Sequence, residues 1–486
     1  MKMAIVGLPE KAVQESMDRI KSAIEHNGFR WPRGRLVINM APADVRKMGS
    51  GFDLGLAIGV MAACNEVKPD RLQGYMIMGE LSLDGSLQGI KGALPIAIHA
   101  RKMGYKGLIL PRQNAHEAAI VSDLEVIPVD HLKEAAAFLN GNMSIAPVCQ
   151  DTRALFSCAQ GSRIEDFAEV RGQIEAKRAL EVAAAGGHNV LMVGPPGSGK
   201  TMLAKRIRTI LPPLNLLEAL ETTKIHSVAG QLGVDASLMA QRPFRAPHHT
   251  ISNVALVGGG SNPQPGEISL AHNGVLFLDE LPEFRRNVLE VLRQPLEDSQ
   301  IVISRARQTV CYPANFMLVA SMNPCPCGHY TNPDRNCVCS THHIRRYLAK
   351  VSGPLMDRID LQVEVPPLPF ADLSGKSAGE TSADIRARVI LARDIQTRRF
   401  QDEPGVFSNA MMGSRLVRKY CDIDTQSITI LRGAVIKLGL SARAYDRILK
   451  VARTIADLND QPKIQSIHIA EAVGYRNLDR EGWAGG

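Results

Sequence analysis

Long apolar runs, a secretion signal and repeated or low-complexity segments are all missing from this 486-residue sequence. No apolar run approaches the roughly eighteen residues of a membrane-spanning helix, and the N-terminus lacks the charged, apolar and small-residue regions of a signal peptide. With 45% hydrophobic and 22% charged residues, the composition also excludes a disordered chain. We therefore expect a cytoplasmic protein of two or three globular domains, with no membrane partner.

The excess of positive charge is small. Lysine and arginine number 57 against 49 aspartates and glutamates, which leaves a formal net charge of +8. A positive surface favours a polyanionic partner such as nucleic acid, although a charge of this size on a long chain is only modest support.

A phosphate-binding loop is the most informative motif. It consists of Gly194, Pro195, Pro196, Gly197, Ser198, Gly199, Lys200 and Thr201. The apolar residues 189–193 predict a strand before the loop, and residues 202–210 predict a helix after it. Glycines let backbone N–H groups surround a polyphosphate, while Lys200 supplies a cation and the Thr201 hydroxyl a ligand for Mg²⁺. The motif predicts an ATP site.

A second motif predicts hydrolysis. Residues 274–278 form an apolar run that ends in Asp279 and Glu280. Such a run is typical of a strand buried on both faces of a parallel sheet, whose carboxyl end is where these sheets bind ligands. We expect Asp279 to coordinate Mg²⁺ through water and Glu280 to polarise the attacking water. The alternative is an acidic helix cap after an ordinary core strand.

Four cysteines fall close together: Cys325, Cys327, Cys337 and Cys339. Disulfides are rare in a reducing cytoplasm, so the cluster favours a structural Zn²⁺ site in an insertion over residues 325–339. One residue separates each pair instead of the usual two, and His329, His342 and His343 are competing ligands. Unligated loop cysteines remain an alternative.

Composition and periodicity divide the chain into four parts. Residues 1–142 contain short strands and helices, residues 143–163 form a linker, residues 164–372 carry the nucleotide motifs, and residues 373–486 have helical apolar spacing. We expect an α/β nucleotide-binding core followed by a small helical domain. Within the core, residues 284–296 predict one helix.

Two further segments of the core suggest contacts with a partner. Residues 242–252 form a long proline-broken block, and such insertions are usually functional. For its adjacent His248 and His249 we favour hydrogen bonding or partner contact over metal binding. Residues 301–310 alternate like a hairpin with Arg305 and Arg307 near the turn, where they are either solvated or placed to meet a phosphate backbone.

Together, the phosphate loop, the acidic pair, the block Arg242-Pro243-Phe244-Arg245-Ala246-Pro247-His248-His249-Thr250 and the segment Asn323-Pro324-Cys325-Pro326-Cys327-Gly328 resemble the YifB/ComM family of magnesium-chelatase-like AAA+ ATPases. The resemblance implies a P-loop NTPase core made of a parallel sheet with flanking helices, an N-terminal Lon-protease-like α+β domain, a C-terminal helical lid and a homohexameric ring. It also implies a DNA helicase that promotes branch migration during homologous recombination of incoming DNA in natural transformation. A chelatase-type motor subunit that assists metal insertion or remodels a protein partner is the alternative.

The resemblance also implies roles for three residues outside the two motifs. Asn323 matches the sensor that orients the attacking water, Arg358 matches the arginine finger that enters the next subunit's site, and Arg443 matches the lid sensor of nucleotide state. Arg447, one helical turn from Arg443, is the alternative lid sensor.

In the N-terminal domain, Asp53 and Leu94 occupy the positions of the Lon-type serine and lysine. A carboxylate cannot replace a serine alkoxide, so we expect no peptidase activity. Family members usually begin some tens of residues earlier, and we therefore expect the first strands of this domain to be missing.

Overall fold

The computed structural model describes residues 3–8, 11–42, 47, 49–150, 165–233, 238–260, 263–305, 308–330, 332, 335–368, 379–476 and 478. Arg307 and part of the predicted linker lie outside these residues. The chain forms two compact units, one made of residues 1–160 and 215–240, the other of residues 161–214 and 241–486.

The first unit is an α+β structure. Its strands are β1 (Met3–Val6), β2 (Leu36–Asn39), β3 (Tyr75–Ile77), β4 (Glu80–Leu81), β5 (Leu87–Gln88), β6 (Gly107–Pro111) and β7 (Glu125–Val129). Strands β3, β6 and β7 form a parallel sheet in that order, β1 pairs in parallel with β2, and β4 pairs antiparallel with β5. Its helices are α1 (Lys11–His26), α2 (Asp53–Ala63), α3 (Ala93–Lys102), α4 (Ala115–Ala118), α5 (Leu132–Leu139) and α9 (Leu216–Ala229).

Helix α9 belongs to this first unit, although the sequence-based division assigns residues 215–240 to the nucleotide-binding region. The backbone N–H of Gly92, just before α3, donates to the carbonyl of Ser227 at 3.1 Å, and the Ser227 hydroxyl also donates to Glu117. The chain therefore leaves the nucleotide-binding unit after α8 and returns to it before β9.

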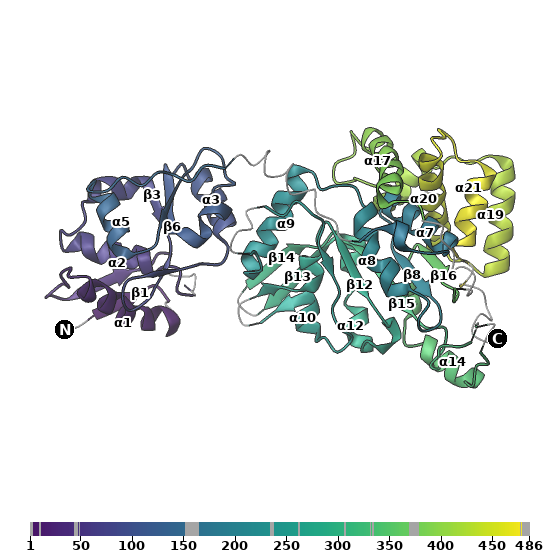
Figure 1. Ribbon diagram of the computed structural model, residues 1–486, viewed down its shortest axis with the longest axis horizontal. Coiled ribbons are helices and arrows are strands. Elements are labelled where there is room, and N and C mark those ends of the chain that lie inside the picture. The colour runs from purple at the N-terminus through teal and green to yellow at the C-terminus, as the bar shows by residue number, and fades with distance from the viewer. Residues whose placement is uncertain are drawn as a thin grey trace. The chain divides into compact units, whose positions relative to one another are not determined.

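The second unit is built on a five-stranded parallel sheet (Figure 1). Its order is β16 (Leu361–Glu364), β8 (Val190–Val193), β15 (Met317–Met322), β12 (Val275–Leu278) and β9 (Phe244–Arg245). Alternate residues of each central strand enter two different cores; Val190 and Met192 pack on one side of the sheet, Leu191 and Val193 on the other. This confirms the predicted α/β core with strands buried on both faces.

Short elements surround this sheet. They are α7 (Ile174–Gly186), α8 (Lys200–Ile210), α10 (Asn253–Val257), α11 (Glu267–Leu270), α12 (Arg286–Glu290), α13 (Pro295–Asp298), α14 (Thr341–Leu348), α15 (Gly353–Met356), the pair β10 (Gly258–Gly259) and β11 (Gln264–Pro265), and the hairpin β13 (Gln300–Arg305) and β14 (Gln308–Pro313). The hairpin prediction is confirmed. The single helix expected over residues 284–296 is instead divided, because Pro295 has no N–H to donate and begins a new helix, α13.

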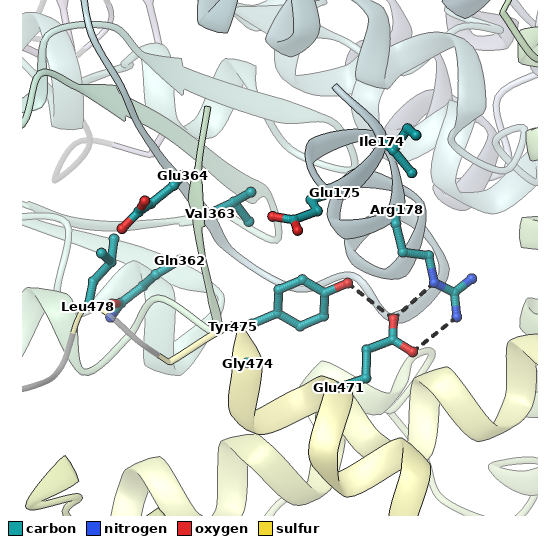
Figure 2. Close-up of a pocket in the computed structure, with 10 residues that line it drawn as sticks. All are labelled: Ile174, Glu175, Arg178, Gln362, Val363, Glu364, Glu471, Gly474, Tyr475 and Leu478. Carbon is teal, nitrogen blue, oxygen red and sulfur yellow. Dashed lines mark hydrogen bonds and ion pairs between the residues drawn. The ribbon is translucent and has the colours of Figure 1, made fainter. Parts of the chain in front are cut away.

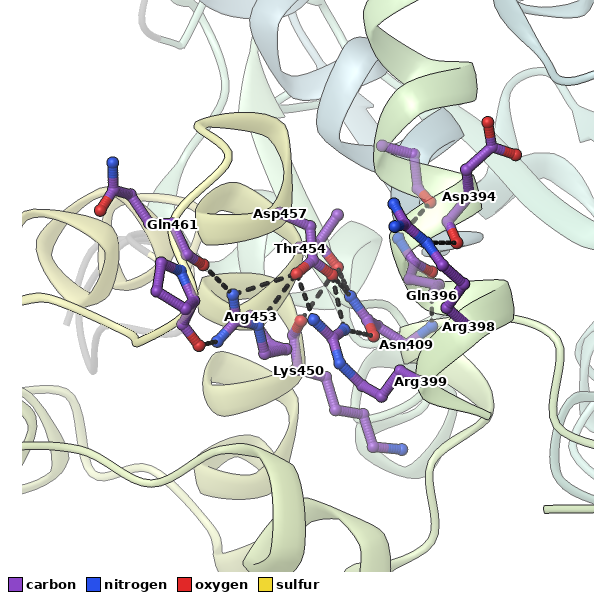
Figure 3. A network of polar contacts seen from close by, with 12 residues as sticks. Asp394, Gln396, Arg398, Arg399, Asn409, Lys450, Arg453, Thr454, Asp457 and Gln461 are labelled. Atoms are coloured by element: carbon purple, nitrogen blue, oxygen red, sulfur yellow. Dashed lines mark hydrogen bonds and ion pairs between the residues drawn. The ribbon is translucent and has the colours of Figure 1, made fainter. Parts of the chain in front are cut away.

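The C-terminal region is helical, as the apolar spacing predicts. It contains α17 (Ser382–Arg399), α18 (Ser414–Tyr420), α19 (Thr425–Leu438), α20 (Ala442–Leu458) and α21 (Ser466–Gly474). A buried polar network joins α17 to α20 (Figure 3). The carboxylate of Asp457 accepts hydrogen bonds from Arg399 Nη1, Asn409 Nδ2 and Arg453 Nε, at 2.7, 2.8 and 3.1 Å. The two guanidinium groups neutralise this fully buried carboxylate, and the three hydrogen bonds fix the two helices together.

Candidate nucleotide site

The phosphate loop connects the carboxyl end of β8 to the first turn of α8. Gly197 and Gly199 adopt positive φ angles of 79° and 91°. At Gly194 a side chain is impossible, since a Cβ atom would lie 2.2 Å from the Val365 carbonyl oxygen. The loop therefore presents backbone N–H groups at a helix N-terminus, which is a favourable place for a phosphate.

Lys200 is held across this loop. Its Nζ donates to the carbonyls of Gly194 and Pro195 at 2.7 and 2.9 Å, and to Oδ1 of Asn323 at 3.3 Å. Burial lowers the pKa of Lys200, while the charges of Asp279 and Glu280 oppose that shift. The sensor candidate and the phosphate-loop lysine are thus neighbours, although 123 residues separate them in sequence.

The two predicted Mg²⁺ ligands touch. Thr201 Oγ1 donates to Asp279 Oδ2 at 2.7 Å, and the hydroxyl of Ser321 donates to the other oxygen of Asp279. A hydroxyl and a carboxylate in contact are suitable donors for a hard cation with several water ligands. Ser321, at the end of β15 two residues before Asn323, is a site residue that motif analysis missed.

Glu280 follows in a left-handed conformation, with φ of 53°. Its backbone N–H donates to Asp279 Oδ1 at 3.1 Å, and its carboxylate is exposed. Nδ1 of His249 lies 3.8 Å from Glu280 Oε2, and the His249 ring stands edge-on to Phe284. The proline-broken block therefore reaches the predicted catalytic carboxylate, which its sequence alone did not indicate.

The arginines of that block have internal partners. Arg245 forms a bidentate pair with Glu267 at 2.6 and 2.7 Å. Arg242 donates to the carbonyls of Pro212 and Asn273, both at 2.7 Å. These contacts fix the block on the sheet edge, so its arginines have structural roles.

Arg358 lies at the opposite end of the sheet. Its carbonyl accepts a hydrogen bond of 3.0 Å from Asn189, which immediately precedes β8, whereas the phosphate loop follows β8. A four-residue strand separates the two positions by roughly 13 Å. The Arg358 side chain is 7% exposed, pairs with Glu297 and donates from Nε to the Arg293 carbonyl at 3.2 Å. Arg358 therefore cannot reach the nucleotide site of its own subunit.

Arg443 and Arg447 begin α20 on this same side, and the structure distinguishes them. The hydrogen bond that Arg358 donates to Glu297 lowers the pKa of Glu297, and the nearby charges of Arg443 and Arg447 lower it further. Arg447 forms an ion pair with the buried carboxylate of Asp360 and donates to the Arg358 carbonyl at 3.2 Å. Arg443 is exposed, so of the two it is the one available to a ligand.

Comparison with known proteins gives the family. Three profiles match the chain: "Subunit ChlI of Mg-chelatase" over residues 1–114, "Magnesium chelatase, subunit ChlI" over residues 166–373, and "Magnesium chelatase, subunit ChlI C-terminal" over residues 379–476. The competence protein ComM of Haemophilus influenzae is 46% identical over 98% of this chain and 92% of its own. The chain belongs to the ComM/YifB family of magnesium-chelatase-like AAA+ proteins.

Two other relatives are similar to this chain over different lengths. The uncharacterized protein YifB of Escherichia coli is 45% identical, with the same coverage of 98% and 92%. The magnesium-chelatase 38 kDa subunit of Cereibacter sphaeroides is 25% identical over 32% of this chain and 52% of its own. Membership of a chelatase-like AAA+ family implies an ATPase. Among the described residues, no helix is both long enough and apolar enough to cross a membrane.

The four clustered cysteines converge, as their close spacing in the sequence predicts. Their sulfur atoms all lie within 4.8 Å of one another, so the group could hold a metal ion. Burial opposes ionisation of Cys327, but N–H groups of His329 and Val338 prevail and lower its pKa to about 6. Burial raises the pKa of the other three thiols.

In the N-terminal unit, the two positions matched to the protease dyad are both buried. Asp53 Oδ2 accepts from Arg19 Nη2 and Nε at 3.0 and 3.2 Å. Burial raises the pKa of Asp53, opposed by Ser16 and Arg19. The carboxylate thus has a structural ion pair, and Leu94 offers no titratable group.

A separate cavity of about 650 Å³ lies beside α7, β16 and α21 (Figure 2). Glu471 accepts from Arg178 at 2.9 Å and from the Tyr475 hydroxyl at 3.1 Å in its wall. None of the predicted site residues lines it, and Arg178, Glu471 and Tyr475 in its wall are hydrogen-bonded to one another.

Proposed function

We propose that this protein is an ATP- and Mg²⁺-dependent homohexameric motor that acts as a helicase on branched or single-stranded DNA. In the cell it promotes branch migration during homologous recombination of incoming DNA in natural transformation. The convergence of Lys200, Thr201, Asp279, Glu280 and Asn323 at one sheet edge carries the proposal of ATP hydrolysis. The name of the Haemophilus relative, competence protein ComM, supports the pathway.

Each residue at this edge has a chemical task. The loop N–H groups and Lys200 bind the phosphates, while Thr201 and Asp279 hold Mg²⁺, which supplies charge neutralisation when bound. Glu280 accepts the proton of the attacking water, and Asn323 orients that water. Phosphoryl transfer depends mainly on positioning and charge, which these fixed groups supply.

Completion of the site requires a neighbouring subunit. Arg358 and Arg443 both lie near Glu297, at the end of the sheet away from the phosphate loop. We infer that they act on the nucleotide of the adjacent subunit after Arg358 exchanges its Glu297 partner for a phosphate. Glu297, 47% exposed on its side chain, is placed to release Arg358 when a neighbour docks.

DNA binding rests on charge and on the β13–β14 hairpin. Arg305 is exposed at the end of β13, beside the turn of the hairpin. An arginine there can contact a phosphate backbone without reading sequence, in agreement with a motor that moves along DNA. The N-terminal unit, with Asp53 in place of a nucleophile, serves ring assembly or DNA binding in this proposal.

Zinc is the proposed ion of the cysteine cluster. Four thiolates in a tetrahedral arrangement are the commonest structural zinc ligands. The alternative function, a chelatase-type motor that assists metal insertion or remodels a protein partner, is favoured by the names of the matching profiles. It predicts an ATPase indifferent to DNA.

ATP hydrolysis with and without DNA tests the proposal. The purified full-length protein should hydrolyse ATP faster when a forked duplex is added, and less so as salt rises, since phosphate contacts are screened. Equal rates with forked DNA, single-stranded DNA and no DNA would support the chelatase-type alternative.

A further inference from the structure

The cysteine cluster is in contact with the phosphate loop. Gly328, between Cys327 and His329, has a φ of 82°, and a Cβ atom there would lie 2.4 Å from Cδ and 2.8 Å from Cγ of Pro196. The Gly328 N–H donates to the Cys325 carbonyl at 3.0 Å, which closes the turn between two of the cysteines. The turn therefore packs against the phosphate loop with no room for a side chain.

The same segment reaches the loop at a second point. Asn323, two residues before Cys325, receives a hydrogen bond of 3.3 Å from Lys200. Lys200 in turn donates to the carbonyl of Pro195, the neighbour of Pro196. Residues 323–328 thus contact both the lysine and the Pro196 ring of the proposed phosphate-binding loop.

The sulfur positions fit a tetrahedral metal. The Sγ atom of Cys325 lies 3.3 Å from Sγ of Cys327 and 3.7 Å from Sγ of Cys337. The Sγ atoms of Cys327 and Cys337 are 3.6 Å apart. A zinc ion with Zn–S bonds of about 2.3 Å sets its sulfurs about 3.8 Å apart. Small adjustments of these side chains would therefore accommodate Zn²⁺.

We propose that Zn²⁺ bound by Cys325, Cys327, Cys337 and Cys339 stabilises the phosphate loop through Gly328 and Asn323, so that nucleotide affinity depends on metal occupancy. This inference rests on the proposed function, because it takes a nucleotide as the ligand of the loop. The coupling acts through packing. The metal fixes the turn at residues 325–328, and the turn fixes Pro196. Without the metal, the turn would be ordered only when nucleotide binds. The entropic cost of that ordering would reduce the net affinity for nucleotide.

Two variants separate the metal from the contact. Cys339→Ser removes a ligand, with the exposed Cys311→Ser as its control. Gly328→Ala keeps all four cysteines but places a methyl group against Pro196. Its control is Gly405→Ala, because Gly405 has nearly the same φ, 81°, with no atom within 4 Å of the added Cβ.

The measurements are zinc content per chain by elemental analysis and the dissociation constant of a fluorescent ADP analogue at fixed free Mg²⁺. We expect about one zinc in the wild type, and nucleotide binding about tenfold weaker or worse in chelator-stripped protein and in Cys339→Ser. Gly328→Ala should lose a similar factor while keeping its zinc. Circular dichroism verifies that each protein is folded.

Three results would overturn the inference. Zinc far below one equivalent, with all four thiols freely titratable, removes the metal. Unchanged nucleotide affinity in stripped protein, or in zinc-loaded Gly328→Ala, removes the coupling. If zinc-loaded wild type binds no nucleotide at all, the proposed ATPase function fails instead, and zinc content still reports on the metal site.

Discussion

At the residue scale, Lys200 and Glu280 share one edge of the sheet but have different partners. Lys200 contacts the loop carbonyls and Asn323, whereas the Glu280 carboxylate is exposed beside His249. In the proposed mechanism the lysine therefore serves phosphate binding and the glutamate serves the chemical step.

Lys200→Ala should weaken ATP binding by about 10–100-fold, since a charged hydrogen-bond donor to the phosphates is lost. Glu280→Gln should bind ATP normally and lower hydrolysis by about 10²–10⁴-fold, the usual contribution of a general base. Equilibrium binding and steady-state hydrolysis distinguish the two. Equal loss of ATP affinity in both variants would contradict this division of tasks.

Most residues of the candidate nucleotide site could be predicted from the sequence. Each follows a strand of one parallel sheet or opens a helix, and such positions converge on a common edge. The partners of Arg358 could not be predicted. Glu297 is 61 residues away and follows a helix boundary at Pro295 that periodicity missed. The His249–Glu280 and Gly328–Pro196 contacts also depend on tertiary packing, which no local pattern encodes.

At the element scale, α20 is anchored to the start of β16 by one buried carboxylate. Asp360 is 4% exposed, accepts from the Asn189 N–H at 2.9 Å and pairs with Arg447. Although burial opposes it, Arg447 and His188 hold the pKa of Asp360 well below its ordinary value. Asp360 thus holds the start of the nucleotide-binding sheet against the helical region.

Asp360→Asn should destabilise this unit by about 3 kcal/mol at pH 7, because it leaves Arg447 without its anionic partner. The folded-state pKa of Asp360 is depressed, so its stabilisation is present above the unfolded pKa near 3.9 and is lost as pH falls through the folded value. Thermal melting of the variant against Asp357→Asn, from pH 7 downward, measures this. A difference that grows as the solution is acidified would contradict the assignment.

The sequence predicts the helices of the C-terminal region but not the unit to which α9 belongs. Helical spacing correctly indicated α19 and α20, because their apolar residues recur every three to four positions in the sequence. Helix α9 lies with the N-terminal unit, and sequence gave no indication of this. Its apolar residues surround the helix with no single face, and contacts such as Ser227–Glu117 span 110 residues.

At the scale of the whole molecule, the arrangement of one subunit agrees with the proposed ring. Each chain carries a phosphate loop at one end of its sheet and Arg358 with Arg443 at the other. The proposed active site therefore forms only where two copies meet.

Arg358→Ala should bind ATP but hydrolyse it about 10³-fold more slowly, as loss of a trans arginine does. Mixing it with Glu280→Gln should restore part of the activity, since some interfaces then unite an intact Arg358 with an intact Glu280. Hydrolysis is measured across mixing ratios. No recovery at any ratio would place Arg358 outside the neighbour's site.

Strand separation of a labelled forked duplex is the most direct test of the central claim, that hydrolysis at this edge drives DNA movement. The purified full-length protein should separate the strands with ATP and Mg²⁺, and Glu280→Gln should bind the fork without separating it. Active ATP hydrolysis by the wild type that leaves forked and four-way DNA substrates unchanged would contradict the account.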